Sequence, residues 1–291
     1  MSPGILLAID IALAVSNNLI LHTMRGKRGL NTGDSLQFNA FVTLIWVVIL
    51  AFVTGLGGFS LPVLGWGLCY GGFYTVFLLS KMQAMAQGPA SVTTFISCAS
   101  LIVPCFFGFL ALNETVSVLQ WIGIALLLFS MYLTVSPRND GSMTPKWKYW
   151  CAVFFLVSGI IGSMLKLIRS SPEKESMNQI MFCGAVLSTV CYFAAARLVS
   201  RKQAGRGPEI PRFAILPMLL CGVITCSYQW INFHLSGRLP ASVLFPIFNG
   251  SLILIVTAVS VPFFHEKMDR KQIIGLVLGL PALIMVAGIL G

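Results

Sequence analysis

A short sequence occurs twice in the chain, and this repeat decides the fold. Residues Gly88–Val92 read GPASV, and residues Leu239–Val243 read LPASV, 151 positions later. Further identities follow at an offset of 151 and then 152. They are Ser100–Ile102 with Ser251–Ile253, and Glu114, Gln120, Ile122 and Gly123 with Glu266, Gln272, Ile274 and Gly275. The chain therefore consists of two related halves of about equal length, with one inserted residue.

Both halves are almost wholly apolar. The 291 residues are 57% hydrophobic and 10% charged, whereas a soluble globular domain has about 25% charged residues. Apolar runs of about 20 residues recur, and each is long enough to cross a hydrocarbon core of about 30 Å as a helix. These runs are 3–22, 36–54, 62–84, 90–111, 118–136, 149–167, 178–196, 213–235, 241–263 and 271–290. We therefore expect an all-α polytopic membrane protein with ten transmembrane helices.

The ten runs divide evenly between the two halves. Five is an odd number, so the second half must enter the membrane in the opposite sense to the first. The sequence thus predicts two inverted five-helix repeats, residues 1–137 and 149–291, joined by a cytoplasmic linker, residues 138–148. Inverted repeats that enclose a substrate site near mid-membrane are typical of secondary transporters, in which they allow alternating access.

The positive charges behind the net charge of +10 are distributed unevenly among the loops, and this distribution predicts the topology. Fourteen of the nineteen Lys and Arg residues fall in the odd-numbered connections between the predicted spans. Excess Lys and Arg in short loops marks the cytoplasmic side, so both termini are predicted to be extracytoplasmic. The short loops and absent tails favour a plasma membrane, and specifically a bacterial inner membrane. This distribution is not that of a nucleic-acid-binding protein.

The motifs shared by the two halves resemble those of a known family. They are a Pro-Ala-Ser start to the fourth and ninth helices, a short turn that carries Glu114 or Glu266, and then Gln-x-x-Gly, at Gln120–Gly123 and Gln272–Gly275. In these features the chain is similar to the drug/metabolite transporter superfamily, specifically its EamA-type ten-helix permeases. The resemblance spans both halves and implies a secondary transporter of small organic molecules, without naming the substrate.

Lys81 is a charged residue inside the third predicted span. An ionised side chain within a membrane usually faces a cavity or a partner, although its long stem can also reach the interface. The repeat-related position is Asn232, which is also polar. We therefore expect Lys81 and Asn232 to line a shared substrate cavity.

Other polar side chains within the spans are further candidates for substrate binding. Tyr74 lies seven residues before Lys81, about two helical turns away, and the eighth span carries Tyr228 and Gln229 close to Asn232. Amides at mid-membrane are costly unless they are hydrogen-bonded, so they bind a ligand or join helices. The remaining amide candidates are Asn17, Asn18 and Asn249. For all of these residues, ordinary helix packing is the alternative interpretation.

Five residues are assigned other roles. Asp10 lies about seven residues inside the first span and is the candidate for proton coupling. Pro89 and Pro240 are expected to begin helices, because proline is favoured in a first turn. Glu114 and Glu266 end spans beside turns, and we expect them to cap the following helix or to pair with loop cations.

Two other classes of function were weighed against a transporter. A polytopic membrane enzyme needs clustered acid, His or Cys side chains, and a non-transporting subunit needs long loops or tails; neither pattern occurs in the sequence. We therefore expect no catalytic residue, no metal and no cofactor. The expected partners are a small-molecule substrate and the lipid bilayer, and the oligomeric state stays open, with a monomer sufficient.

Overall fold

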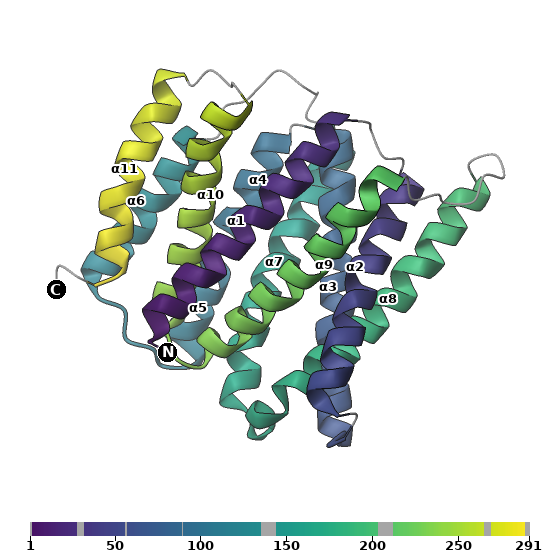
Figure 1. Cartoon of the computed structure of the whole chain (residues 1–291). Helices are drawn as coiled ribbons and strands as arrows, with labels where there is room; N and C mark the ends of the chain where they lie inside the picture. Colours follow the sequence, from purple (N-terminus) through teal and green to yellow (C-terminus); the bar gives the residue numbers. More distant parts are fainter. Residues whose placement is uncertain are drawn as a thin grey trace. The chain divides into compact units, whose positions relative to one another are not determined.

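The computed structural model describes residues 2–27, 32–55, 57–88, 90–134, 144–202, 212–264 and 269–288, which are helical except for short connections (Figure 1). No strand occurs in these ranges. The helices in chain order are α1 (Pro3–Lys27), α2 (Thr32–Thr54), α3 (Leu61–Gln87), α4 (Ala90–Ala99), α5 (Ile102–Ala111), α6 (Val118–Thr134), α7 (Pro145–Ser170), the 3₁₀ helix η1 (Pro172–Ser176), α8 (Met177–Lys202), α9 (Arg212–Ser236), α10 (Ala241–Phe264) and α11 (Arg270–Val286).

These helices coincide with the ten predicted apolar runs. Among the described residues, eight helical segments are long and apolar enough to cross a membrane, with α4 and α5 counted as one. The helices α6 and α11 have 17 residues each, which is the lower limit for a membrane span. Several helices exceed their runs; α7 begins at Pro145, four residues before the run 149–167, because helical hydrogen bonding continues into the polar interface. The prediction of an all-helical, multi-pass membrane protein is confirmed.

The predicted span 90–111 is interrupted between α4 and α5. Pro104 explains the interruption, because it has no N–H to donate to the carbonyl of Ser100 and its ring crowds that carbonyl. The Ser100 carbonyl accepts instead from the N–H of Val103, at 3.0 Å. The Ser100 hydroxyl donates to the Ser158 hydroxyl of α7 at 2.7 Å, so the interruption is tied to a neighbouring helix.

The chain packs into two compact units. The first contains Met1–Ile11, Val76–Leu167 and His234–Gly291, and the second contains Ala12–Thr75 and Ile168–Phe233. Each unit takes helices from both predicted repeats, so the division by packing differs from the division by sequence. The helices α1, α3, α7 and α9 each contribute residues to both units.

Within the first unit, α6 and α11 form a close antiparallel pair. Gln120 Oε1 accepts from the N–H of Ser117 (3.0 Å), and Gln120 Nε2 donates to the Val286 carbonyl (3.3 Å). At the other end of the pair, Gln272 Oε1 accepts from the N–H of Asp269 (3.0 Å), and Gln272 Nε2 donates to the Thr134 carbonyl (3.2 Å). Each glutamine thus caps its own helix and binds the last turn of the other.

Glycine allows the same two helices to approach closely. A Cβ on Gly275 would meet Thr134 N at 2.7 Å and the Ser130 carbonyl at 2.8 Å, and one on Gly123 would meet Met285 Cβ at 2.9 Å. The hydroxyl of Ser130 donates to the Gly275 carbonyl at 2.6 Å. The Gln-x-x-Gly motif is therefore explained by helix capping and helix contact.

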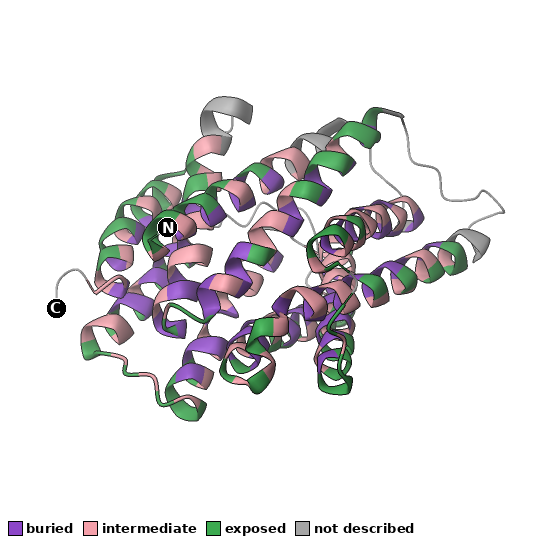
Figure 2. Ribbon diagram, turned by 60° about the horizontal axis from the view of Figure 1, so that its bottom comes forward, coloured by how far each residue is buried: buried purple, intermediate pink, exposed green. Residues whose placement is uncertain are grey.

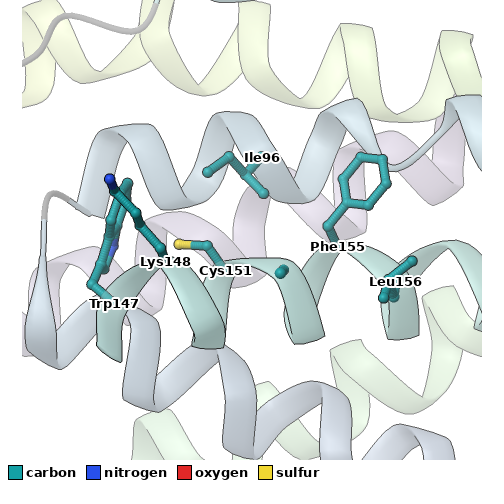
Figure 3. A pocket seen from close by; sticks show the side chains of 7 residues that line it. Ile96, Trp147, Lys148, Cys151, Phe155 and Leu156 are labelled. Carbon is teal, nitrogen blue, oxygen red and sulfur yellow. The ribbon is translucent and has the colours of Figure 1, made fainter. Parts of the chain in front are cut away.

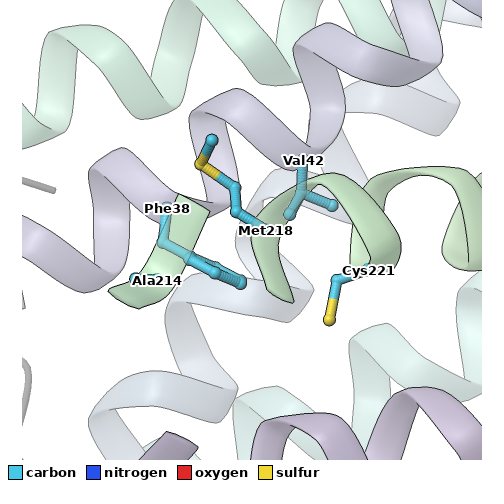
Figure 4. Packing of buried hydrophobic residues seen from close by; sticks show 5 residues of the cluster. All are labelled: Phe38, Val42, Ala214, Met218 and Cys221. Atoms are coloured by element: carbon cyan, nitrogen blue, oxygen red, sulfur yellow. The ribbon is translucent and has the colours of Figure 1, made fainter. Parts of the chain in front are cut away.

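In the second unit, α2 packs against both α8 and α9. Phe38 and Val42 of α2 form a buried cluster with Ala214, Met218 and Cys221 of α9 (Figure 4). Between α3 and α8 the backbones approach so closely that a Cβ on Gly71 would meet the Gly184 carbonyl oxygen at 2.5 Å. Small residues allow such contacts between membrane helices, where van der Waals packing stabilises association.

Figure 2 shows exposed residues along the helices, and many exposed residues of both units are large and apolar. Phe52 of α2 is 86% exposed, Leu61 of α3 82% and Val118 of α6 77%. A soluble protein rarely leaves such surfaces uncovered. The exposed apolar faces therefore suit contact with lipid.

Candidate functional site

Five aromatic side chains of the second unit form a connected buried group. Trp46 comes from α2, Tyr70 and Tyr74 from α3, Tyr192 from α8 and Phe233 from α9. We call these five residues, together with Tyr228 and Gln229 of α9, the aromatic cluster. Four membrane helices therefore contribute to it.

The rings of this cluster are in direct contact. The centroids of Trp46 and Tyr74 are 5.2 Å apart, and those of Tyr70 and Tyr74 are 6.0 Å apart in a stacked arrangement. Tyr70 also meets the edge of Phe233 at 5.4 Å. Such pairs contribute about 0.5–1.5 kcal/mol each beyond the burial of their area, so the rings hold one another in place.

Polar groups of the cluster contact one another. The side chains of Tyr74 and Gln229 are hydrogen-bonded, and Tyr228 lies near both Tyr70 and Tyr74. The Tyr192 hydroxyl donates to the Tyr74 carbonyl at 3.1 Å. The indole nitrogen of Trp46 is buried and has no hydrogen-bond partner in the part of the chain that the structure describes. A buried indole N–H usually finds an acceptor, so this donor is suited to a ligand.

A series of polar pairs joins these helices to one another and to α1. Thr43 and Thr189 join α2 to α8 at 2.9 Å, and Thr75 and Ser188 join α3 to α8 at 3.2 Å. The Thr225 hydroxyl of α9 donates to Asn17 Oδ1 of α1 at 3.2 Å. Asn17, a predicted binding residue, therefore has one oxygen contact within the unit while its amide nitrogen has further donor capacity.

Several predicted binding residues have local bonds or lie in the first unit. Asn18 Nδ2 donates to the Ala14 carbonyl at 2.8 Å, and Asn249 Nδ2 donates to the Phe245 carbonyl at 2.9 Å. Lys81 is half-buried and lies near Cys98 of α4. Asn232 is buried on α9 of the second unit. The structure thus brings Tyr74, Tyr228 and Gln229 together, and it places Lys81 and Asn249 in the other unit.

Asp10 lies in the first unit and its side chain is completely buried, with 0% exposure. It stands in the middle of the membrane segment Pro3–Leu21 of α1. Carboxylates at this depth are costly and usually mark ion or proton pathways.

Glu114 connects three helices of the first unit. Its Oε1 lies 2.6 Å from Lys166 Nζ near the end of α7, and its Oε2 accepts from the Ala241 N–H at the start of α10, also at 2.6 Å. Lys166 also donates to the Leu239 carbonyl. We expected Glu114 to cap the following helix or to bind a loop cation. It instead caps α10, and its cation is the buried Lys166, which is only 4% exposed.

The predicted helix starts can be compared in part. Pro240 stands directly before α10, and its carbonyl accepts from the N–H of Leu244 at 2.9 Å. Pro240 therefore precedes the first helical residue rather than occupying the first turn. Pro89 and Glu266 lie outside the described residues.

The comparisons with known proteins identify the family. The model of the EamA-like transporter family matches residues 3–136. Over residues 3–136 the chain belongs to this family. One crystal structure, described only as that of a protein, is similar with a TM-score of 0.69 and 14% sequence identity, over 98% of this chain and 99% of the other. No curated protein matches the chain.

An EamA-like chain is a membrane transporter of the drug/metabolite superfamily, and this fits the multi-pass helical fold. Members of the family are transporters rather than enzymes. The solved structure, at 14% identity, shares its fold with nearly the whole of this chain.

Sequence analysis missed several residues of the EamA-like chain that the structure brings forward. Trp46 and Tyr192 were read only as parts of apolar spans, although each carries a polar atom that must be placed within a membrane. Lys166 was counted as a loop cation, although it lies inside the apolar run 149–167. A search for every hydrogen-bonding atom inside an apolar run would have found all three.

Proposed function

We propose that this EamA-like protein is a secondary transporter that moves a small organic solute across the membrane by alternating access. It lies in the plasma membrane, with both termini extracytoplasmic. The observation that carries the proposal is the aromatic cluster with its buried Trp46 donor. Sites for small organic ligands are mostly apolar and aromatic, with a few placed polar groups.

The chemistry of the cluster favours a solute with an apolar or aromatic part and hydrogen-bonding groups. The faces of Trp46 and Tyr74 supply apolar contact, and the Trp46 N–H and the Gln229 amide supply polar contact. Asn17, Asn18 and Asn232 add amides on neighbouring helices of the same unit. Lys81 and Asn249 belong to the first unit and stay predicted binding residues there.

Alternating access rests on the two halves being inverted repeats. The equivalent contacts of Gln120 and Gln272 support the inversion, because they relate the fifth helix of each half, α6 and α11, in antiparallel orientation. If the other helices follow the same relation, the two halves exchange conformations and open the site to each side in turn.

Proton coupling is assigned to Asp10. Its carboxyl group is fully buried in a membrane helix, where a change of protonation alters the cost of burial greatly. Protonation and deprotonation during the cycle would couple proton movement to the solute.

Flux of candidate solutes into reconstituted vesicles tests the site. We expect Trp46→Phe and Gln229→Ala to lower flux at least tenfold, because each removes a polar group among the buried rings. Gln179→Ala is the matched control, since Gln179 bonds only the Gly57 carbonyl at 3.3 Å on an exposed part of the same unit. If Trp46→Phe and Gln229→Ala proteins fold and transport as well as the control, the assigned site is wrong.

A further inference from the structure

An apolar groove lies between α4 and α7 in the first unit. Its volume is about 430 Å³, and it is lined by Ile96 of α4 and by Trp147, Lys148, Cys151, Phe155 and Leu156 of α7 (Figure 3). Lys148 and Trp147 lie at one end, and Phe155 and Leu156 lie at the other (Figure 3). The groove thus runs from a cationic end along apolar side chains.

The cationic end of the groove is held rigidly. Trp147 Nε1 donates to the Thr93 hydroxyl of α4 at 3.2 Å. The Trp147 ring also lies against Gly88, where any side chain would overlap it. Ala84 and Cys151 complete a buried cluster around the ring. The shape of the groove is therefore preformed.

Exposed cations and aromatic rings gather at this end. Lys146 and Lys148 are exposed, and Tyr149 between Lys148 and Trp150 is 63% exposed. Tyr and Trp are enriched at the membrane–water interface, which places the start of α7 at headgroup depth. Two lysines at this depth attract anionic lipid headgroups.

The length of the groove fits one leaflet. Trp147 and Leu156 are nine residues apart on α7, so the groove extends about 13 Å along the helix axis. Half of a hydrocarbon core of about 30 Å is about 15 Å. A chain that enters at Lys148 would therefore reach nearly to mid-membrane.

We infer that this groove binds one anionic phospholipid from the surrounding leaflet. The phosphate lies against Lys148, which lines the groove, and Lys146 on the same helical turn adds to the positive potential. One acyl chain follows Cys151 and Ile96 to Phe155 and Leu156. The charge at the open end decides the class of lipid, because a zwitterionic headgroup carries no net charge to complement two lysines. This site is separate from the aromatic cluster and does not depend on the proposed substrate.

Native mass spectrometry of the full-length protein measures the bound lipid. The protein is released from two kinds of bilayer. One contains phosphatidylcholine alone, and in the other phosphatidylglycerol makes up a fifth of the lipid. We expect one phosphatidylglycerol to be retained in preference to phosphatidylcholine. Each lysine near an anionic surface is worth about fivefold in affinity, so Lys146→Gln with Lys148→Gln should reduce the preference about 25-fold. Lys174→Gln, at the exposed cation of η1, should leave it unchanged.

A second pair of variants tests the groove without changing charge. Ala152 lines the groove, and Ala152→Trp should fill it and abolish lipid retention. Ile160→Trp, at a 37%-exposed position on the same helix, should retain the lipid. Equal retention of both lipids, or no effect of Ala152→Trp, would overturn the proposal. Thermal stabilisation by soluble glycerol phosphate equal to that by the lipid would also overturn it, because the acyl chain would then have no role.

Discussion

Gln120 and Gln272, 152 positions apart, make equivalent pairs of hydrogen bonds at opposite ends of one helix pair. Each accepts from the backbone N–H three residues before it and donates to the last turn of the opposing helix. The two carbonyls that receive these bonds, at Thr134 and Val286, are also 152 positions apart. The contact between α6 and α11 is therefore two-fold in its bonding pattern.

This equivalence predicts equal effects of substitution. Gln120→Ala and Gln272→Ala each remove two hydrogen bonds of about 1 kcal/mol, so each should lower the free energy of unfolding by about 2 kcal/mol. Thermal or denaturant unfolding in detergent measures the loss. Gln87→Ala is the control, because Gln87 donates only to Gln83 on the same helix and should cost less than 0.5 kcal/mol. Clearly unequal losses would show that the two ends are not equivalent.

Replacing glycine by alanine should change the free energy of unfolding differently at Gly275 and at Gly65, because only Gly275 is in close contact with another helix. Gly275→Ala brings a methyl group against the backbone of Thr134 and Ser130 and should destabilise the protein by about 1–3 kcal/mol. Gly65→Ala, in α3 with nothing within 4 Å of the new Cβ, should be neutral or stabilising by up to about 1 kcal/mol. The midpoint of thermal unfolding reports both, and a stable Gly275→Ala protein would contradict the close contact.

The pair of Glu114 and Lys166 should show strong coupling. Glu114→Gln or Lys166→Met alone leaves a buried charge without its counterion, which costs about 3–5 kcal/mol. The double variant removes both charges and should be less destabilised than the sum of the single variants by at least 1 kcal/mol. Denaturant unfolding of the wild-type protein, the two single variants and the double variant gives the coupling energy of this double-mutant cycle. Additive losses would mean that the two side chains do not interact.

Asp10→Asn should separate proton coupling from solute binding. In vesicles with an imposed pH gradient, the wild-type protein should accumulate solute, whereas the variant should only equilibrate it. Solute exchange without a gradient should persist, because the amide preserves the shape of the side chain. Asp34→Asn, near the start of α2, is the matched control. Full gradient-driven accumulation by Asp10→Asn would remove Asp10 from the coupling mechanism.

The fold was largely predictable from hydrophobicity. Membrane helices must bond their own backbone, so a run of about 20 apolar residues specifies both the helix and its bounds. The runs 62–84 and 241–263 correspond closely to α3 and α10. The interruption of the helix at Ser100 could not be predicted from Pro104 alone. Pro246 stands in a similar apolar run, and α10 nevertheless continues through it.

The contacts of the site were less predictable. Helical spacing placed Tyr228 and Asn232 on one face of a helix, with Gln229 beside them. No pattern along the chain indicates that Gln229 bonds Tyr74. Trp46 was missed because a tryptophan in an apolar run looks like lipid-facing or packed surface. Glu114 was expected near its own turn, yet its partners at Ala241 and Lys166 are 127 and 52 positions away. Contacts between distant segments depend on packing that a single sequence does not encode in its periodicity.

The reciprocal glutamine contact has a consequence for the ancestry of this architecture. Each half of the chain contains both a donating glutamine and an accepting carbonyl, so the α6-type helix of one half is complementary to an antiparallel copy of itself. A half-length chain inserted in both directions would form this contact as a homodimer. Fusion of two such chains would leave the contact unchanged and would commit one partner permanently to each direction.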